Sequence, residues 1–155
     1  MTTDDHSASV WGKDIPISTK HAIEICNFIK GKSLMKSKQM LKEVMGKKIA
    51  VPFKIFKRNV GHKPGRMAAG RYPYKASHYI LNLLESLEAN AQNKGLDVNS
   101  LYLTTIIPNK AARPFHFSRH RGRKMKRTNI QIMAEEMKEE KKVQPEKKQK
   151  DKKTK

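Results

Sequence analysis

Residues 101–133 read LYLTTIIPNKAARPFHFSRHRGRKMKRTNIQIM, and this stretch decides the fold. Its first end, 101–107, is rich in β-branched and aromatic residues, and its second, 128–133, alternates Ile with polar side chains. Both patterns are typical of strands. We therefore expect two antiparallel strands that form an extended hairpin over 101–133, with a long loop between them.

The loop of this hairpin is strongly basic. From Lys110 to Arg127 it holds eight Lys or Arg, two His and no carboxylate. Connections longer than about 12–15 residues are usually functional or disordered, and a segment of one charge has no means of stabilising itself. We therefore expect the loop to take its shape from a polyanion, with RNA as the leading candidate.

Three helices are predicted upstream of the hairpin. The clearest follows Pro73, which suits a first turn, and its apolar stripe has helical spacing: Ala76, Ile80, Leu83, Leu84, Leu87 and Ala91. Two shorter helices follow the candidate N-caps Ser18 and Ser33. Their apolar faces are Ala22, Ile25, Cys26 and Ile29 in one, and Leu34, Leu41, Val44 and Met45 in the other.

An edge strand and two tails complete the expected fold. Val10 to Ile17 suits a short edge strand, because Pro16 fits an edge better than a sheet centre. The class is α+β: three helices packed on a small antiparallel sheet, with a long protruding β-hairpin and a disordered basic C-terminal tail. One domain then spans 10–136, between a flexible N-terminus at 1–9 and a disordered Lys/Glu-rich tail at 137–155.

A further basic loop is expected at 46–73, where eight Lys or Arg occur without any acid. Aromatic residues accompany both basic loops, and they either anchor a loop to the domain or stack on unpaired RNA bases, at about 1–3 kcal/mol per base. Anchoring is favoured for Phe53 and Tyr74. Stacking suits Phe115 and Phe117 better, because they have few local apolar partners.

The composition limits the class of partner. The chain has 155 residues and a formal net charge of +20, which indicates an anionic partner such as nucleic acid or a membrane surface. The single cysteine, Cys26, excludes a disulfide framework. The chain has no run of 18 apolar residues, so no membrane span is predicted. Its first residues do not resemble a signal peptide. A cytosolic or nuclear protein is therefore expected.

Neither a metal site nor a catalytic site is predicted, and no cofactor is expected. Zinc needs four suitable ligands, usually in paired spacings, but Cys26 lies on an apolar helical face and His62, His116 and His120 stand among Lys and Arg. Most of the 14 acids are expected in the termini or on exposed sides of helices. No glycine-rich phosphate loop links a strand to a helix, so an enzyme is not expected.

Several motifs follow one another in a characteristic order. They are ISTKHAIEIC at 17–26 with IKGK at 29–32, AVPF at 50–53 with GHK at 61–63 and GRYP at 70–73, EANA at 88–91 with KGLD at 94–97, and Arg-x-x-Gly-Arg at 119–123. Within residues 8–136 they resemble the universal ribosomal large-subunit protein twenty-two family, in its archaeal and eukaryotic form. The chain departs from the family at His120, where a small Ala is usual.

The resemblance implies a structural constituent of the large ribosomal subunit that binds rRNA and supports translation and subunit assembly. Its hairpin tip would contribute to the wall of the peptide exit tunnel. The implied partners are large-subunit rRNA, neighbouring large-subunit ribosomal proteins and the nascent polypeptide at the hairpin tip, with no homo-oligomer. The implied location is the cytoplasm, in the large ribosomal subunit, with nucleolar assembly if the source is eukaryotic.

The candidate RNA-binding residues are mainly cations, which suit phosphate, and Arg also stacks on bases. The expected rRNA contacts are Lys20, Lys30, Lys32, Lys54, Lys57, Arg58, His62, Lys63, Arg66, Arg71, Lys75, Lys110, Arg113, Lys124, Lys126 and Arg127. The expected tunnel-tip hairpin residues are Arg119, His120, Arg121, Gly122 and Arg123. For His120, stacking on a base and contact with the nascent chain both stay open.

Two other classes of protein stay open from the residues alone. A free-standing nucleic-acid-binding protein, either an RNA chaperone or chromatin-associated, would also be basic, but a DNA reader concentrates charge on a helix suited to the major groove. A membrane-surface protein needs a basic amphipathic helix, whereas the most amphipathic helix expected here has acids on its polar side. Charge on two long loops favours RNA.

Overall fold

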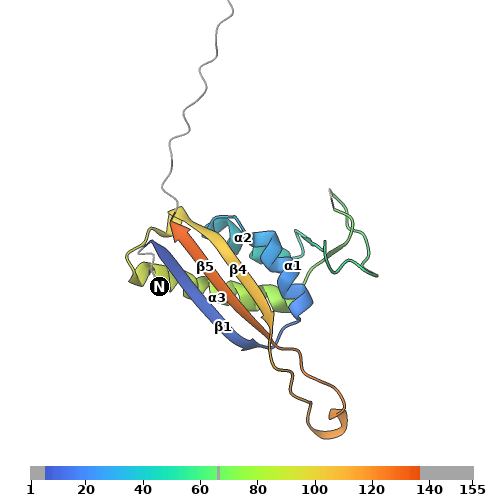
Figure 1. Cartoon of the computed structure of the whole chain (residues 1–155). Helices are drawn as coiled ribbons and strands as arrows, with labels where there is room; N and C mark the ends of the chain where they lie inside the picture. The colour runs from blue at the N-terminus through green and yellow to red at the C-terminus, as the bar shows by residue number, and fades with distance from the viewer. Residues whose placement is uncertain (1–5, 66, 137–155) are drawn as a thin grey trace, which may run out of the picture.

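The sheet contains three antiparallel strands in the order β1-β5-β4 (Figure 1). The computed structural model describes residues 6–65 and 67–136, so the tail expected at 137–155 lies outside the described residues. The strands are β1 (Ser7–Ile15), β4 (Leu101–Lys110) and β5 (Thr128–Glu136). The predicted hairpin strands are thus paired, and both extend further than their sequence patterns indicated.

Three helices, α1 (Thr19–Ile29), α2 (Leu34–Met45) and α3 (Tyr74–Asn93), lie together behind the sheet in Figure 1. Alternate strand residues such as Ile130 and Ile132 are fully buried, because they face these helices across one apolar core. The predicted α+β class and its three helices are therefore confirmed.

Strand β4 contains a bulge that the sequence pattern did not reveal. Leu103 pairs with Ala134 while Thr105 pairs with Met133, so Thr104 is the additional residue. A bulge of this kind shifts the alternation of side chains along the strand. As a result, both Leu103 and Ile106 are buried although three positions separate them.

Side chains at the C-terminal end of α3, including its C-cap Lys94, contact the start of the outer edge of β1. Asn90 Nδ2 donates to the Ser9 carbonyl at 3.0 Å, and Lys94 Nζ donates to the Ser7 carbonyl at 2.8 Å. The strand begins at Ser7, which corrects the expectation that 7–9 belong to a flexible N-terminus. The prediction that this is an edge strand is confirmed, and Pro16 falls just after its end.

The apolar stripe of α3 is buried with one exception. Leu83 is only partly buried, whereas its neighbour Leu81 is buried. Leu83 packs over Gly12 of β1, where an added Cβ would lie 2.9 Å from the Leu83 side chain. The absence of a side chain at Gly12 is what allows α3 to approach the strand closely.

Replacing Leu84 with Ala is expected to destabilise the domain by about 2–5 kcal/mol, because a fully buried Leu leaves a cavity. Urea denaturation followed by circular dichroism measures the free energy of unfolding. Glu85→Ala, at the next and exposed position of the same helix, is the matched control. A loss of unfolding free energy as small as that of Glu85→Ala would show that Leu84 does not face the core.

The hairpin continues beyond its regular strands and projects from the sheet (Figure 1). Ala111 N donates to the Arg127 carbonyl at 3.2 Å, and His116 N donates to the Arg123 carbonyl at 2.8 Å. A 3₁₀ turn, η2 (Ser118–His120), lies at the tip. The expectation that this loop has no means of stabilising itself is therefore wrong, since backbone pairing between the two arms does not depend on side-chain charge.

Candidate RNA-binding surface

Glu24 of α1 is buried and orders the basic loop at 46–73, which is the first of the two basic loops along the chain. It is 1% exposed, and its carboxylate accepts hydrogen bonds from the backbone N–H groups of Lys54 (3.0 Å), Ile55 (2.8 Å) and Phe56 (2.7 Å). This acid is an exception to the expectation that acids lie in the termini or on exposed helix sides. The only sequence signal was that it is the single charged residue within 22–29.

Two anchoring predictions for aromatic residues have opposite outcomes. Phe53 is buried, and its ring lies edge-on to His21 with 5.5 Å between centroids, so anchoring is confirmed there. Tyr74 is 63% exposed, so the same prediction is wrong. Tyr74 opens α3 and follows Pro73, and its backbone N–H bonds to the Tyr72 carbonyl while its ring faces outward.

The first basic loop, expected at 46–73, is folded back on itself. Its ends pair as two short strands, β2 (Val51–Pro52) and β3 (Gly70–Arg71). Further out, His62 and Ala69 form a bridge. Lys54, Lys57 and His62 stand beside Phe53 on a pocket of about 540 Å³ that could contact RNA.

Two threonines join the start of α1 to the base of the hairpin. The hydroxyl oxygens of Thr19 and Thr128 are 2.9 Å apart, and the buried Thr128 hydroxyl donates to the Ile17 carbonyl at 3.1 Å. The N-terminus of α1 is thereby fixed next to the point where the hairpin leaves the sheet. Its N-cap, Ser18, makes no side-chain capping bond.

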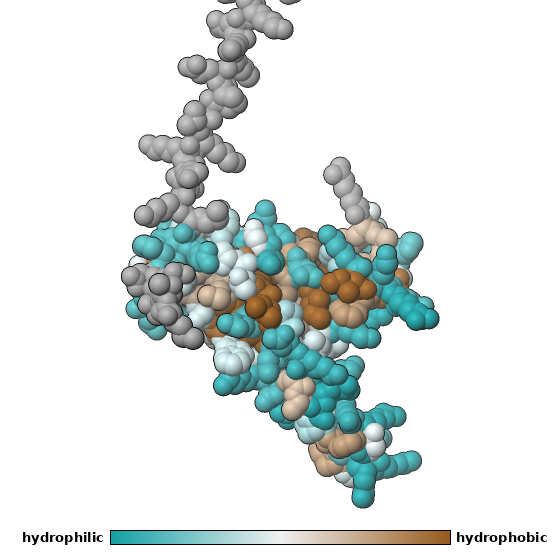
Figure 2. Space-filling view, viewed as in Figure 1, coloured by the Kyte–Doolittle hydropathy of each residue, from teal (hydrophilic) through white to brown (hydrophobic). Residues whose placement is uncertain are grey.

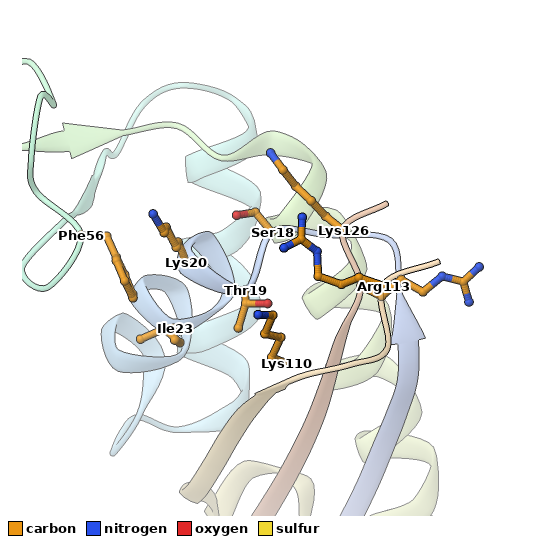
Figure 3. A pocket seen from close by; sticks show the side chains of 9 residues that line it. Ser18, Thr19, Lys20, Ile23, Phe56, Lys110, Arg113 and Lys126 are labelled. Carbon is orange, nitrogen blue, oxygen red and sulfur yellow. The ribbon is translucent and has the colours of Figure 1, made fainter. Parts of the chain in front are cut away.

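A pocket of about 450 Å³ lies where α1, the first basic loop and the hairpin base meet (Figure 3). We call it the hairpin-base pocket; its lining residues are Ser18, Thr19, Lys20, Ile23, Phe56, Lys110, Arg113, Lys126 and Arg127. It brings together five of the predicted rRNA contacts, which come from segments more than 80 residues apart in sequence. Its lining contains no acid.

The charged side chains that line this pocket are all cations. The pKa of His21 is lowered, first by burial and then by the nearby charges of Arg71 and Lys126. Within 6–65 and 67–136, the ion pairs are Lys38 with Glu88 and His6 with Glu136, and neither lies in a basic loop. In the described structure the cations of the two basic loops therefore form no ion pair, although the buried Glu24 carboxylate shares a pocket with Lys32 and Lys54.

The other predicted rRNA contacts are spread around this centre. Lys32 lies near Lys54 on a smaller pocket of about 160 Å³, and its pKa is lowered by burial and then by Lys36 and Lys54. The Lys63 and Lys124 ammonium groups lie over the rings of Tyr72 and Phe115. The exposed members that line no described pocket are Lys30, Arg58, Arg71, Lys75 and Lys124. Arg66 lies outside the described residues.

The predicted tip residues form a separate group at the far end of the hairpin (Figure 1). All five of them are exposed, and none lines the hairpin-base pocket: Arg119, His120, Arg121, Gly122 and Arg123. Phe117 beside them is 81% exposed. The projecting hairpin is mostly hydrophilic in Figure 2. Such a surface offers both cations and exposed aromatic rings to a ligand.

Other kinds of site find no support in the part of the chain that the structure describes. There, no three His, Cys, Asp or Glu side chains gather as a metal would require. Cys26 is buried, which raises the pKa of its thiol to about 12. Among the described helices, none has the length and apolar character needed to span a membrane.

Comparison with known proteins gives consistent matches. The family model described as "Ribosomal protein L22p/L17e" matches residues 10–135. A large ribosomal subunit protein uL22 from Archaeoglobus fulgidus is 40% identical over 136 residues, covering 83% of this chain and 88% of the relative. Its counterpart from Nanoarchaeum equitans is 36% identical over 142 residues, covering 87% and 82%. That from Methanopyrus kandleri is 43% identical over 111 residues, covering 69% of each chain.

Proposed function

Because this chain belongs to the ribosomal protein L22p/L17e family, we infer that it is a structural constituent of the large ribosomal subunit that binds rRNA and supports translation. The role is architectural, as befits a ribosomal protein family, rather than catalytic. It is then located in the large subunit in the cytoplasm, among rRNA and other ribosomal proteins.

One observation is the main support for rRNA binding. Two basic loops meet at the hairpin-base pocket, whose lining has no acid. Phosphate contacts dominate the affinity of proteins for nucleic acids. Lys and Arg on loops can follow an irregular RNA surface, whereas DNA readers place them on a helix for the major groove. The arrangement therefore favours structured RNA over duplex DNA.

The finer part of the proposal concerns the hairpin. Its tip, Arg119–Arg123, contributes to the wall of the peptide exit tunnel, where it borders the nascent polypeptide. The support is the projection of the hairpin (Figure 1) and its exposed cations, together with the Arg-x-x-Gly-Arg element. Nucleolar assembly applies if the source is eukaryotic.

Sucrose-gradient sedimentation at high salt tests this function. The tagged full chain is expected to co-sediment with large ribosomal subunits. Recovery only in the light fractions, or with chromatin, would support a free-standing nucleic-acid-binding protein and contradict the proposal.

Binding to large-subunit rRNA is expected to depend steeply on salt. If about eight phosphates are neutralised, log K falls against log salt concentration with a slope of roughly −6 to −7. Filter binding of the full chain to transcribed large-subunit rRNA, between low and physiological salt, gives the slope. A slope near −1 would show that phosphate contacts do not dominate.

A further inference from the structure

We propose that the hairpin-base pocket receives one unpaired rRNA nucleotide, whose base packs against Phe56 and Ile23 while its phosphates meet the cations of the hairpin base. The proposal rests on the proposed function, since rRNA supplies the nucleotide. It goes further by assigning a particular pocket to an unstacked base, whereas rRNA binding alone requires only contact with the backbone.

The two sides of the pocket differ in chemistry. Phe56 and Ile23 lie on one side, and Lys110, Arg113 and Lys126 lie on the other (Figure 3). Phosphate binding by itself needs no aromatic wall. Proteins that read RNA in loops and bulges stack unpaired bases on aromatic rings and bind the adjoining backbone through cations. The pairing of a ring with cations across one concavity therefore matches a nucleotide better than a phosphate alone.

The size of the pocket and the position of Lys20 agree with this ligand. Its volume of about 450 Å³ falls in the range of roughly 300–1,000 Å³ that is usual for small-molecule sites. The Lys20 ammonium lies over the Phe56 ring, 5.6 Å from its centroid. A base that stacks on this face displaces the ammonium, whose flexible stem lets it contact the phosphate of the same nucleotide.

The pocket is built by the protein and does not need RNA to form. Phe56 is held through its backbone N–H by the buried Glu24. The Thr19–Thr128 contact fixes α1 to the strand, and the Ala111–Arg127 hydrogen bond fixes the two arms of the hairpin. A preformed pocket lowers the ordering cost of binding, which suits the capture of a single base.

Phe56→Leu tests the proposal, because it keeps an apolar side chain and the backbone bond to Glu24 but removes the aromatic ring. The affinity of the full chain for transcribed large-subunit rRNA is expected to fall about tenfold, within the range for loss of one stacked base. Phe56→Tyr keeps an aromatic ring at this position, so its affinity is expected to equal that of the wild-type chain. Trp11→Leu, at an exposed position of β1 outside the predicted RNA contacts, is the matched control for removing a ring outside the pocket.

Chemical probing of the rRNA in the same complexes identifies the nucleotide. An increase in reactivity at one unpaired base with Phe56→Leu, absent with Trp11→Leu, supports the proposal. Unchanged affinity with Phe56→Leu, or reactivity changes confined to paired nucleotides, overturns the proposed nucleotide site. In that case, binding of the wild-type chain still supports the proposed function. If the wild-type chain itself fails to bind the rRNA or to enter large subunits, the proposed function fails as well.

Discussion

Replacing Glu24 with Ala is expected to weaken rRNA binding, although it raises the formal net charge from +20 to +21. If charge alone governed affinity, the substitution would strengthen binding. The buried carboxylate, however, fixes the backbone from Lys54 to Phe56. Without it, the aromatic wall of the hairpin-base pocket loses its position, and affinity is expected to fall about tenfold, as for the loss of one stacked base.

The same substitution should also reduce stability, by roughly 3 kcal/mol. A hydrogen bond to a charged group contributes about 1.5–3 kcal/mol, and the freed N–H groups regain part of this from water. Hydrogen exchange is expected to show faster exchange at residues 54–56 first. Binding is therefore measured at a temperature where circular dichroism shows the variant folded.

Two controls separate position from charge. Glu24→Gln makes the same charge change but keeps the size of the side chain, and its oxygen can still accept from Ile55 and Phe56; an intermediate loss is expected. Glu85→Ala also removes one negative charge, but from an exposed position, and should bind as well as wild type or better. Tighter binding by Glu24→Ala than by Glu85→Ala would contradict the positioning role.

Replacing Arg119, Arg121 and Arg123 together with Ala is expected to remove the tip contacts while the domain still assembles into subunits. Each charge-assisted hydrogen bond lost contributes roughly 1.5–3 kcal/mol before compensation. The slope of log K against log salt should become shallower by roughly 2–3, about one per phosphate contact. If the tip borders the tunnel wall as proposed, chemical footprints should change there and nowhere distant.

A triple variant of equal charge provides the comparison. Lys13, Lys36 and Lys42 are exposed and lie outside the predicted RNA contacts, so their joint replacement with Ala should leave the tunnel-wall footprint unchanged. If the tip variant instead preserves that footprint and loses distant ones, the assignment of the tip is wrong. Comparing the two separates local contact from the general loss of three charges.

Features set by local sequence could be predicted, whereas features set by distant contacts could not. The helix α3 and the pairing of β4 with β5 follow from periodicity within each segment, and the structure contains both. The bulge at Thr104 was missed because it depends on the register against β5. Leu83 was misplaced because its surroundings depend on Gly12, far away in the sequence.

The candidate site shows the same division. Sequence reasoning found the cations of the hairpin-base pocket, because runs of Lys and Arg without acid are visible in any segment. It could not find that Phe56 shares a concavity with Lys110, since that requires the folded path of both basic loops. Glu24 was missed for the same reason: its three partners lie 30 to 32 residues away.

The cover that α3 provides for β1 has a consequence for the protein before it joins a ribosome. A newly made copy must remain soluble while it waits for its RNA, and an open strand edge can pair with another chain and seed aggregation. Asn90 and Lys94 occupy the outward carbonyls of Ser9 and Ser7, so a second copy finds fewer acceptors there. Between synthesis and assembly, the helix that builds the core thus also blocks the first acceptors of this strand edge.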